Sequence, residues 1–473
     1  MRIIYSCIAL CLTAFNALAV TIESASGQLA SLISDKSITE LQVSGTINAV
    51  DFKFIADELT SLQSLDISNA TITAYSSSNT LFANARSFDD NTIPVGCFAS
   101  STLQSVKLPA SLSVIGEGAF LSCNNITSIT LPESLDSIAP YAFSACEHLA
   151  AVVIPASVKV VGEGAFSHCT ALASVTVTDG STDLKIADKA FYGCTALASA
   201  NIANRTVSIG NYAFCDCTGE NFAIVTGSNS RLSSIGENAF QNSALKAFDF
   251  AKYPKLDNIS QYAFANTKLQ SISVPDNITF IGEGAFFGNG DLTNIDLASN
   301  SASISKLLFA GCNPVDATGM TDQTTEVGEY AYYGCNQINK LIIPENVTYI
   351  GKYAFGNMSQ LAKVTSVNTT APSLGEAVFS GISTPDVLLT TKIAATGYRE
   401  GDQWKDFNFT LNGDASNNGD ININDITSII SHIKGSTPKS FLLEAADANV
   451  DNDVDQADVT DVLNIIINSS TTE

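Results

Sequence analysis

The sequence predicts a repeat solenoid of short parallel strands with an irregular, turn-rich outer side, followed by a small all-α domain that binds calcium. A hexapeptide ending in an aromatic residue recurs about every 23 residues, and a 12-residue loop rich in Asp and Asn occurs twice near the C-terminus. The predicted segments are a signal peptide (1–19), a cap with entry repeats (20–92), the solenoid (93–390), a closing segment or linker (391–411) and the calcium-binding domain (412–473).

The first 19 residues have the pattern of a signal peptide. Arg2 gives a short positive region, Ile3 to Phe15 form an apolar core, and Ala17-Leu18-Ala19 fits a cleavage site. The apolar core is too short to span a bilayer as a stable helix, and no later stretch reaches about 18 apolar residues. We therefore expect an exported protein, secreted or at the cell surface, with no transmembrane segment.

Composition excludes two classes of protein. The chain has 473 residues, with 47 Asp and Glu against 23 Lys and Arg, and a formal net charge of −24. A nucleic-acid binder needs a basic face, so we expect no nucleic-acid partner. Apolar residues make up 45% of the chain and charged residues 15%, which is the reverse of a disordered acidic chain.

The repeat is clearest at Ile115-Gly116-Glu117-Gly118-Ala119-Phe120, which recurs almost unchanged at 161–166 and 281–286. The aromatic residue that ends each copy, here called the anchor, falls at Phe98, Phe120, Phe143, Phe166, Phe191, Phe214, Phe240, Phe264, Phe286, Phe309, Tyr332, Phe355 and Phe379. Each copy also has a strand-like cluster such as Leu103 to Pro109, in which Val106 and Leu108 share one face and Pro109 ends the strand. Such a unit cannot bury its own core, whereas stacked copies can, and stacking gives a solenoid.

The cysteines follow the same period. Of the 11 cysteines, Cys7 and Cys11 leave with the signal peptide, and seven others lie three residues after an anchor: Cys123, Cys146, Cys169, Cys194, Cys217, Cys312 and Cys335. A column of identical side chains at one depth favours buried thiols over disulfides. The oxidation state of the close pair Cys215 and Cys217 stays open.

The outward side of the strands is mostly small and polar. The residue between the two inward apolar side chains reads Lys107, Thr130, Val153, Thr176, Asn201, Asp249, Ser273, Asp296, Ile342 and Thr365. No aromatic ring stands there for a sugar to stack on, so a flat protein-binding face and an ordinary solvated sheet remain the two interpretations. Tyrosines also recur two residues before an anchor, where filling of a turn is favoured over an interface role: Tyr141, Tyr212, Tyr262, Tyr330 and Tyr353.

The pattern L-x-x-V-x-I-P followed by I-G-x-x-A-F-x-x-C resembles the BspA-like leucine-rich repeats of bacterial surface proteins, over roughly residues 36–410. The resemblance implies a solenoid of the leucine-rich-repeat type that binds an unknown protein ligand on its face. Ile38 to Ile72 resembles the family's N-terminal entry, and Tyr398, Trp404 and Phe407 resemble its closing segment. Copies at 219–230 and 313–325 depart from the pattern, so local bulges are expected there.

Two loops near the C-terminus have the spacing of an EF-hand calcium loop. Oxygen-bearing residues alternate along the first loop as Asp414, Ser416, Asn418, Asp420, Asn422 and Asp425, and along the second as Asp447, Asn449, Asp451, Asp453, Asp455 and Asp458. Gly419 permits the sharp turn at loop position 6. Ca²⁺ prefers six to eight oxygen ligands, so the loops predict two bound Ca²⁺ ions. Each loop runs into a helical apolar stripe, first Ile426, Ile429, Ile430 and Ile433, then Val459, Val462, Leu463 and Ile466.

Asp at loop position 12 and a single helix after each loop resemble a dockerin module over residues 412–468. The resemblance implies calcium-dependent attachment to a cohesin-like partner through loop positions 10 and 11. These are Ile423 and Asn424 in the first loop, and Gln456 and Ala457 in the second. The alternative is that calcium serves only to hold the fold together.

The sequence contains no catalytic motif. His148, His168 and His432 lie outside any metal or nucleophile pattern, and there is no Walker loop, nucleophile elbow or zincin motif. We therefore expect a protein that is not an enzyme. It is either an adhesion or scaffold protein, or a non-catalytic accessory subunit of an extracellular, cellulosome-like complex that degrades polysaccharides, since dockerins often belong to such complexes.

Overall fold

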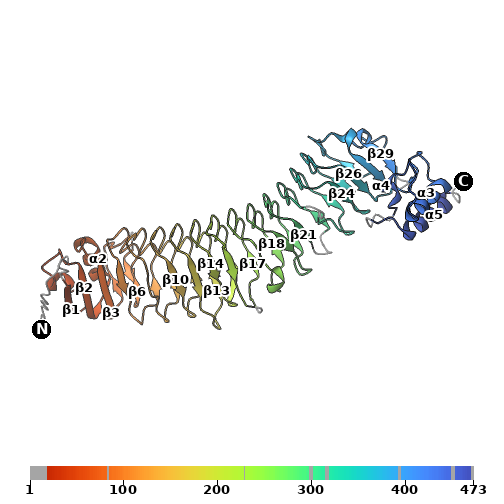
Figure 1. Ribbon diagram of the computed structural model, residues 1–473. Coiled ribbons are helices and arrows are strands. Elements are labelled where there is room, and N and C mark those ends of the chain that lie inside the picture. Colours follow the sequence, from red (N-terminus) through yellow and green to blue (C-terminus); the bar gives the residue numbers. More distant parts are fainter. Residues whose placement is uncertain are drawn as a thin grey trace, which may run out of the picture. The chain divides into compact units, whose positions relative to one another are not determined.

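The computed structural model describes residues 19–82, 85–227, 230–297, 302–314, 319–391, 396–448 and 453–469. Within them, short parallel strands follow one another coil by coil, and helices lie near the C-terminus (Figure 1). The chain divides into two compact units, Met1–Leu269 (the first unit) and Gln270–Glu473 (the second unit). The predicted signal peptide, apart from Ala19, lies outside the described residues.

The first unit begins with a parallel sheet in the order β1–β2–β3–β7. Its strands are β1 (Ala19–Ser24), β2 (Glu40–Ile47), β3 (Ser64–Ile72) and β7 (Ser105–Lys107); α1 (Leu29–Leu32), α2 (Ala49–Glu58) and the antiparallel pair β4 (Tyr75–Ser76) and β5 (Ser87–Phe88) lie between them. Asn48 and Asp51 form a capping box at the start of α2. Phe52 of α2 contacts Phe98 edge-on, with ring centroids 5.8 Å apart, so α2 covers the first anchor.

Most coils contribute two strands, where the sequence pattern predicts one. In the first unit the first strands include β10 (Ala151–Ile154), β12 (Ser174–Val177), β14 (Ser199–Asn201) and β16 (Ala223–Val225), which form a sheet in that order. The second strands β6 (Thr92–Ile93), β8 (Val114–Ile115), β9 (Ser137–Ile138), β11 (Val160–Val161), β13 (Leu184–Ile186), β15 (Thr206–Ile209) and β17 (Ser234–Ile235) form another; η1 (Phe250–Lys252) and β18 (Asn258–Ile259) follow. The second strand has only two residues in most coils, so alternation of apolar and polar residues cannot reveal it in the sequence.

The second unit repeats this arrangement. Its first strands are β19 (Ser271–Ser273), β21 (Asn294–Asp296), β24 (Lys340–Ile343), β26 (Lys363–Ser366), β28 (Leu388–Thr391) and β29 (Asn408–Leu411); its second strands are β20 (Phe280–Ile281), β22 (Ser303–Ile304), β23 (Glu326–Val327), β25 (Tyr349–Ile350) and β27 (Ser373–Leu374). The short helices η2 (Thr384–Asp386) and η3 (Trp404–Asp406) precede α3 (Ile423–Ile433), α4 (Leu443–Ala446) and α5 (Gln456–Ser469). None of the helices in the described ranges is long and apolar enough to cross a membrane.

The anchors stack ring upon ring in each unit. From Phe98 to Phe264, neighbouring ring centroids lie 5.1 to 5.6 Å apart. From Phe286 to Phe379, they lie 5.6 to 5.9 Å apart. Trp404 and Phe407 meet Phe379 edge-on, at 5.3 and 4.8 Å, so the predicted closing residues cover the last anchor.

The cysteine column donates hydrogen bonds from one coil to the next. Each of the seven column thiols donates to the carbonyl oxygen of the preceding coil's anchor, with Sγ–O distances of 2.9 to 3.3 Å. Cys123, for example, donates to Phe98, and Cys335 donates to Phe309. All nine cysteines after residue 19 are buried and free. The column pattern predicts this state for seven of them, and Cys97 and Cys215 share it. The thiol therefore serves both as a small packing group and as a weak donor.

Each coil passes through the left-handed backbone region twice, two residues before and two residues after its anchor. The angle φ lies between +52° and +61° at the first position and between +52° and +77° at the second. This geometry directs alternate N–H groups at the next coil, so that Gly118, Phe120 and Ser122 donate to carbonyls of the following turn. Non-glycine side chains at these positions carry a conformational cost.

The left-handed positions explain the tyrosine column. The ring of Tyr141 lies over Gly164 of the next coil, where an added Cβ would be 2.6 Å from the ring. At the second position the ring of His168 covers Gly193 in the same way. Tyr330 and Tyr353 instead stack on one another at 5.1 Å. The tyrosines thus pack along the outer turns, which agrees with the turn-filling interpretation.

Replacing Ala377 by glycine is expected to raise the free energy of unfolding by about 0.5–1 kcal/mol. Ala377 has φ of +52°, and a methyl group has little packing to lose. Chemical denaturation of the full chain measures the change. Ala362→Gly is the matched control, because Ala362 is exposed and does not have positive φ, so this variant should lose stability. Similar shifts in both variants would contradict the argument.

A column of alternating charge lies three residues before the anchors of the second unit: Glu283, Lys306, Glu329, Lys352 and Glu376. Lys306 Nζ lies 3.3 Å from Glu283 Oε1, and Lys352 Nζ lies 2.5 Å from Glu376 Oε2. Neighbouring coils therefore bring these positions together, as the repeat register predicts.

Replacing Lys306 by glutamate is expected to lower the free energy of unfolding by about 0.5–1 kcal/mol at low salt. The variant loses the pair with Glu283 and places three carboxylates in succession. Lys306→Gln should fall between the two proteins, and high salt should reduce both effects because exposed charges are screened. Thermal melts at low and high salt measure the differences. A glutamate variant that melts with the parent protein at low salt would show that the column is not stacked.

Candidate functional site

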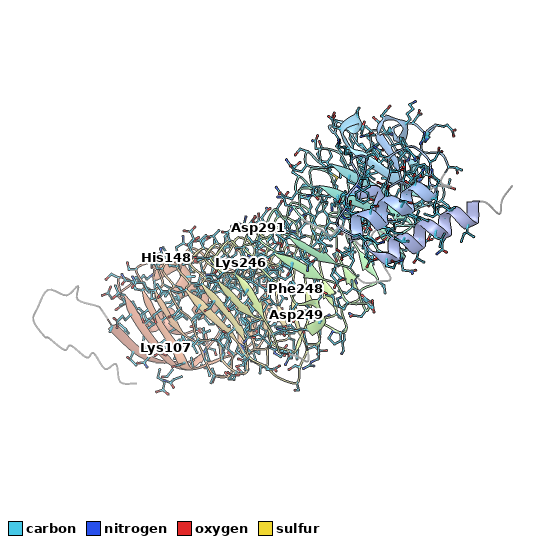
Figure 2. The ribbon with its side chains drawn as sticks, turned by 45° about the vertical axis from the view of Figure 1, so that its right-hand side comes forward. Lys107, His148, Lys246, Phe248, Asp249 and Asp291 are labelled. Atoms are coloured by element: carbon cyan, nitrogen blue, oxygen red, sulfur yellow. The ribbon has the colours of Figure 1, made fainter. Side chains whose placement is uncertain are left out.

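The residues at the outward position of each coil's first strand segment form a column in each unit, here called the strand face: Lys107, Thr130, Val153, Thr176, Asn201 and Asp249 in the first unit, and Ser273, Asp296 and Ile342 in the second. All of them are exposed except Asn201, which is half-buried. Asp249 caps the short helix η1 and does not stand in a strand. Register places like positions side by side, since Val153 pairs with Thr176 and Thr176 with Asn201. Lys107 Nζ lies 3.0 Å from Asp66 Oδ2. Asp249 directly follows Phe248, whose side chain is buried (Figure 2). Residues 127–132 around Thr130 form no strand.

The strand face differs from the predicted column at Thr365. That residue is 4% exposed, and its register partner Thr390 is also buried. The apolar residues of the column are open: Val153 is 55% exposed and Ile342 is 42% exposed. The strand face therefore ends before β26 and combines small polar groups with isolated aliphatic side chains.

The second strands carry exposed aromatic rings that the sequence pattern of the first strands does not include. Phe280 of β20 is 61% exposed and Tyr349 of β25 is 37% exposed. Both precede the inward Ile of their strand, so they point outward by alternation. Only recognition of the second strand would have identified these positions from sequence.

The three histidines occupy separate sites with ordinary partners. His148 Nδ1 lies 2.5 Å from the Asn124 carbonyl oxygen, and the ring of His168 meets Tyr192 edge-on. His432 contacts the hydroxyl of Thr437 at 2.9 Å. Among the residues that the structure describes, no three His, Cys, Asp or Glu side chains converge as a metal cluster would.

The first loop folds around two buried carboxylates. Asp414 accepts hydrogen bonds from the N–H groups of Asn418 and Gly419 at 2.9 and 2.7 Å. Asp425 accepts from Ser416 and Asn422 at 2.8 and 2.7 Å. Asn422 caps α3, and Asp425 is the third residue of that helix, so the two form a capping box. Hydrogen bonds thus link position 1 to positions 5 and 6, and position 12 to positions 3 and 9. The exposed Asp420 donates its N–H to Asn418 Oδ1 at 2.9 Å.

The second loop shows the same local bonding where it is described. Asp458 accepts hydrogen bonds from the N–H groups of Ala448 and Asp455, at 2.7 and 2.8 Å. Asp455 accepts from Ala457 at 2.6 Å. Asp447 is buried and Asp453 is exposed. Asn449 and Asp451 lie outside the described residues.

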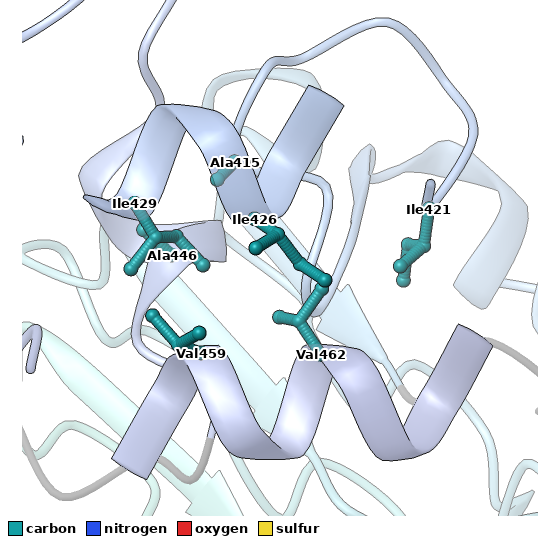
Figure 3. Close-up of a cluster of buried hydrophobic side chains, with 7 residues drawn as sticks. All are labelled: Ala415, Ile421, Ile426, Ile429, Ala446, Val459 and Val462. Carbon is teal, nitrogen blue, oxygen red and sulfur yellow. The ribbon is translucent and has the colours of Figure 1, made fainter. Parts of the chain in front are cut away.

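The two loops and their helices share one small core. Figure 3 shows its seven buried residues, which come from the first loop, α3, α4 and α5: Ala415, Ile421, Ile426, Ile429, Ala446, Val459 and Val462. Ala448 and Val454 of the second loop pack against them. Leu411 of β29 packs against the same cluster. Ile426, Ile429, Val459 and Val462 belong to the predicted helical stripes, whereas Ile433 and Leu463 of those stripes are exposed.

The donor set of the first loop fits a hard cation. Asp414 is 2% exposed and Asp425 is fully buried, and neither has a lysine or arginine partner in the described part of the chain. The Ser416 hydroxyl at loop position 3 is buried and lacks a hydrogen-bond partner among the described groups. Buried carboxylates and an unsatisfied hydroxyl in a calcium-type spacing are what bound Ca²⁺ would stabilise.

The residues predicted to contact a partner lie at the start of the two helices. Ile423 and Asn424 begin α3 and are exposed, with Ile423 at 65%. Gln456 and Ala457 begin α5 and are also exposed. Three further apolar side chains of these helices are open to solvent: Ile433, Leu463 and Ile467.

Comparison with known proteins bears on the solenoid. A family model described as a BspA type leucine-rich repeat region matches residues 91–219, 184–316 and 325–410, and no curated protein matches. Among solved structures, a leucine-rich repeat protein from Bacteroides ovatus ATCC 8483 is 19% identical, covering 71% of this chain and 91% of that chain at a TM-score of 0.47. A leucine-rich cell surface protein from Faecalibacterium prausnitzii A2-165 is 23% identical, covering 75% and 85% at a TM-score of 0.39. The pneumococcal vaccine antigen PcpA is 16% identical, covering 69% and 80% at 0.40.

Proposed function

Because the chain belongs to the BspA-type leucine-rich repeat family, we propose that it is an exported, non-catalytic surface protein that binds another protein through the strand face. The observation that carries the proposal is the composition of that face, where small polar Thr176 stands beside exposed Val153 in the first unit and Ile342 is exposed in the second. Such side chains lose little conformational entropy when a partner covers them. The signal peptide pattern at residues 1–19 supports export.

The proposal is tested by capture of proteins from host matrix and culture-surface extracts on the full chain. Val153→Glu and Thr176→Glu place charge on neighbouring positions of the strand face and should abolish capture of its ligand. Val160→Glu is the matched control, because Val160 is exposed on a second strand, outside the strand face. Capture that is unchanged in the Val153 and Thr176 variants would overturn the proposal.

We propose that each C-terminal loop binds one Ca²⁺ ion. Asp414, Ser416, Asn418 and Asp425 would provide side-chain oxygens in the first loop, and Asp447, Asp455 and Asp458 would provide them in the second. The buried, unsatisfied hydroxyl of Ser416 supports the first site. Bound calcium would neutralise carboxylates that are buried in a core too small to hold the helices by itself.

Calorimetry on the full chain should count two calcium ions. Asp425→Ala and Asp458→Ala each remove the loop-closing carboxylate and should leave one ion. Asp420→Asn is the matched control within the loop, because position 7 contributes its backbone carbonyl, and two ions should remain. Circular dichroism should show loss of helix when a chelator is added. Two ions persisting in either alanine variant would show that the loops are misassigned.

We further propose that α3 and α5 dock the protein to a cohesin-like partner. Exposed Ile423, Asn424, Gln456 and Ala457, together with Leu463 and Ile467, support a contact surface on these helices. In the alternative function, this partner belongs to an extracellular complex that degrades polysaccharides. If the parent protein captures a cohesin-bearing glycosidase scaffold and the Ile423→Asp variant does not, that alternative is supported. Capture of host matrix protein alone would support adhesion. Unchanged capture by Ile423→Asp would overturn docking through this surface.

A further inference from the structure

The C-terminal helices follow the solenoid without an intervening linker. β29 pairs with β28 in register from Asn408 to Leu411, and the N–H of Asn412 extends the ladder to the Thr391 carbonyl at 2.9 Å. Asp414, the first residue of the first loop, lies three residues after the end of β29 and donates its N–H back to Leu411 at 2.9 Å. The last strand of the sheet and the first loop are therefore one continuous hydrogen-bonded segment.

Packing joins the two parts as closely as hydrogen bonding does. Leu411 of β29 packs against the helical core. Gly413 has φ of +98°, and a Cβ at this residue would lie 3.0 Å from Ile421 and 3.5 Å from Val462. The backbone thus enters the helical core directly from the sheet, at a position where only glycine fits.

Asn412 connects the same strand to the second loop. Its Nδ2 donates to the carbonyl oxygen of Ala448 at 2.6 Å, and Ala448 follows Asp447 directly. The neighbouring Gly413 N–H donates to Ala445 at 2.8 Å. Residues 412–414 therefore contact both loops, although the two loops begin 33 residues apart.

Terminal coils of a solenoid are its weakest part, because each coil is stabilised by its neighbours and the last has a neighbour on one side only. Trp404 and Phe407 cover the aromatic column at this end. Trp404 and Phe407 do not end the strand ladder, which instead reaches its last strand at β29 and continues into residues 412–414. A ligand that orders the loops must therefore also order the end of the ladder.

We propose that residues 412–448 and 453–469 form a calcium-dependent end cap of the solenoid, in which bound Ca²⁺ stabilises strands β26, β28 and β29. This inference rests on the proposed binding of calcium. Loss of calcium releases Leu411 and Asn412 from the helical core, and the last strands then open while the aromatic column stays covered by Trp404. Coupling is reciprocal, so weakening the link at Asn412 also weakens calcium binding.

Hydrogen exchange on the full chain, with excess Ca²⁺ and with a chelator, tests the proposal. We expect chelation to speed exchange in residues 363–366, 388–391 and 408–411 by about tenfold or more. Exchange in β10, β12 and β14 of the first unit should stay the same. Asn412→Ala should still bind two ions, but more weakly, and its last strands should exchange faster even with calcium bound.

Asn408→Ala is the matched control, since Asn408 is exposed on the same strand, and it should behave as the parent protein does. Two bound ions with no change of exchange in β26, β28 and β29 on chelation would overturn the end cap and leave calcium binding intact. Absence of calcium binding in calorimetry would overturn both. Equal behaviour of Asn412→Ala and Asn408→Ala would overturn the coupling through Asn412.

Discussion

Replacing Arg205 by methionine is expected to lower the free energy of unfolding of the first unit by about 3–5 kcal/mol. The Arg205 guanidinium is fully buried and donates to the carbonyl oxygens of Thr178, Val158 and Pro155 at 2.8, 2.6 and 2.8 Å. Burial lowers its pKa from the usual value. Methionine fills a similar volume but leaves these carbonyl groups buried without donors, so the cost is that of several unsatisfied acceptors.

Arg231→Met is the matched control for this prediction. Arg231 also donates to main-chain carbonyl oxygens, those of Gly180 and Ser181. Its side chain, however, is one-third exposed, and its Nη1 lies 2.7 Å from Asp183 Oδ1. Water can replace most of these partners, so the loss should be about 1 kcal/mol or less. Hydrogen exchange in β11 and β13 together with chemical denaturation measures both variants. Equal losses would show that Arg205 does not hold the coils together through its carbonyl partners.

Raising the pH above 9 is expected to destabilise the first unit steeply. Burial raises the pKa of Cys215 to about 12 from an ordinary value of 9.0, and burial also raises the pKa of Cys146, Cys169 and Cys194. Below pH 9 the thiols are protonated in both states, so stability is constant. Above pH 9 the unfolded chain loses thiol protons that the folded chain keeps, so unfolding becomes more favourable until the folded pKa is reached. Each thiol contributes at most about 1.4 kcal/mol per pH unit.

Denaturation midpoints between pH 8 and pH 10.5 check this expectation. Cys169→Ala and Cys194→Ala should each reduce the slope, whereas Ser167→Ala, a buried hydroxyl change in the same coil, should leave it unchanged. A thiol reagent should label the native protein slowly, and should label all nine cysteines after residue 19 once the chain is denatured without reductant. A slope that is the same in all variants, or protection of the denatured chain, would contradict the free thiol column.

The period of the sequence was sufficient to predict the solenoid, because each anchor, such as Phe120, is followed about 23 residues later by an equivalent anchor on which it can stack. Spacing was also sufficient to place Asp414 and Asp425 at the two ends of one 12-residue loop, whereas the binding of calcium there stays a prediction. The second strands could not be predicted in this way, since a strand of two residues, such as Val114–Ile115, is too short to show alternation of apolar and polar side chains. Phe280 and Tyr349 stand on those strands, so their exposure could not be predicted either.

Long-range contacts are the other part that sequence reasoning does not reach. Nothing near Arg205 in the chain indicates that its partners are Pro155 and Val158, about two coils away. The same is true of Asn412 and Ala448, which are 36 residues apart. Tyr141 in the left-handed region contradicts local preference, and only the glycine of the next coil makes room for its ring. Each of these residues depends on a partner that the local pattern does not specify.

The placement of a large ring over a glycine in the following coil limits how such a gene can change its number of repeats. Tyr141 needs Gly164, and His168 needs Gly193, so these coils are matched in size to their successors, whereas Tyr330 and Tyr353 stack on one another. Deleting or inserting one coil by recombination brings unmatched neighbours together and demands a second change to restore the fit. Exchange of a block that contains both the ring and the glycine it covers requires no compensating change. Where a ring covers a glycine in this way, the smallest interchangeable module is therefore a block that contains both coils, and the copy number there should evolve in blocks.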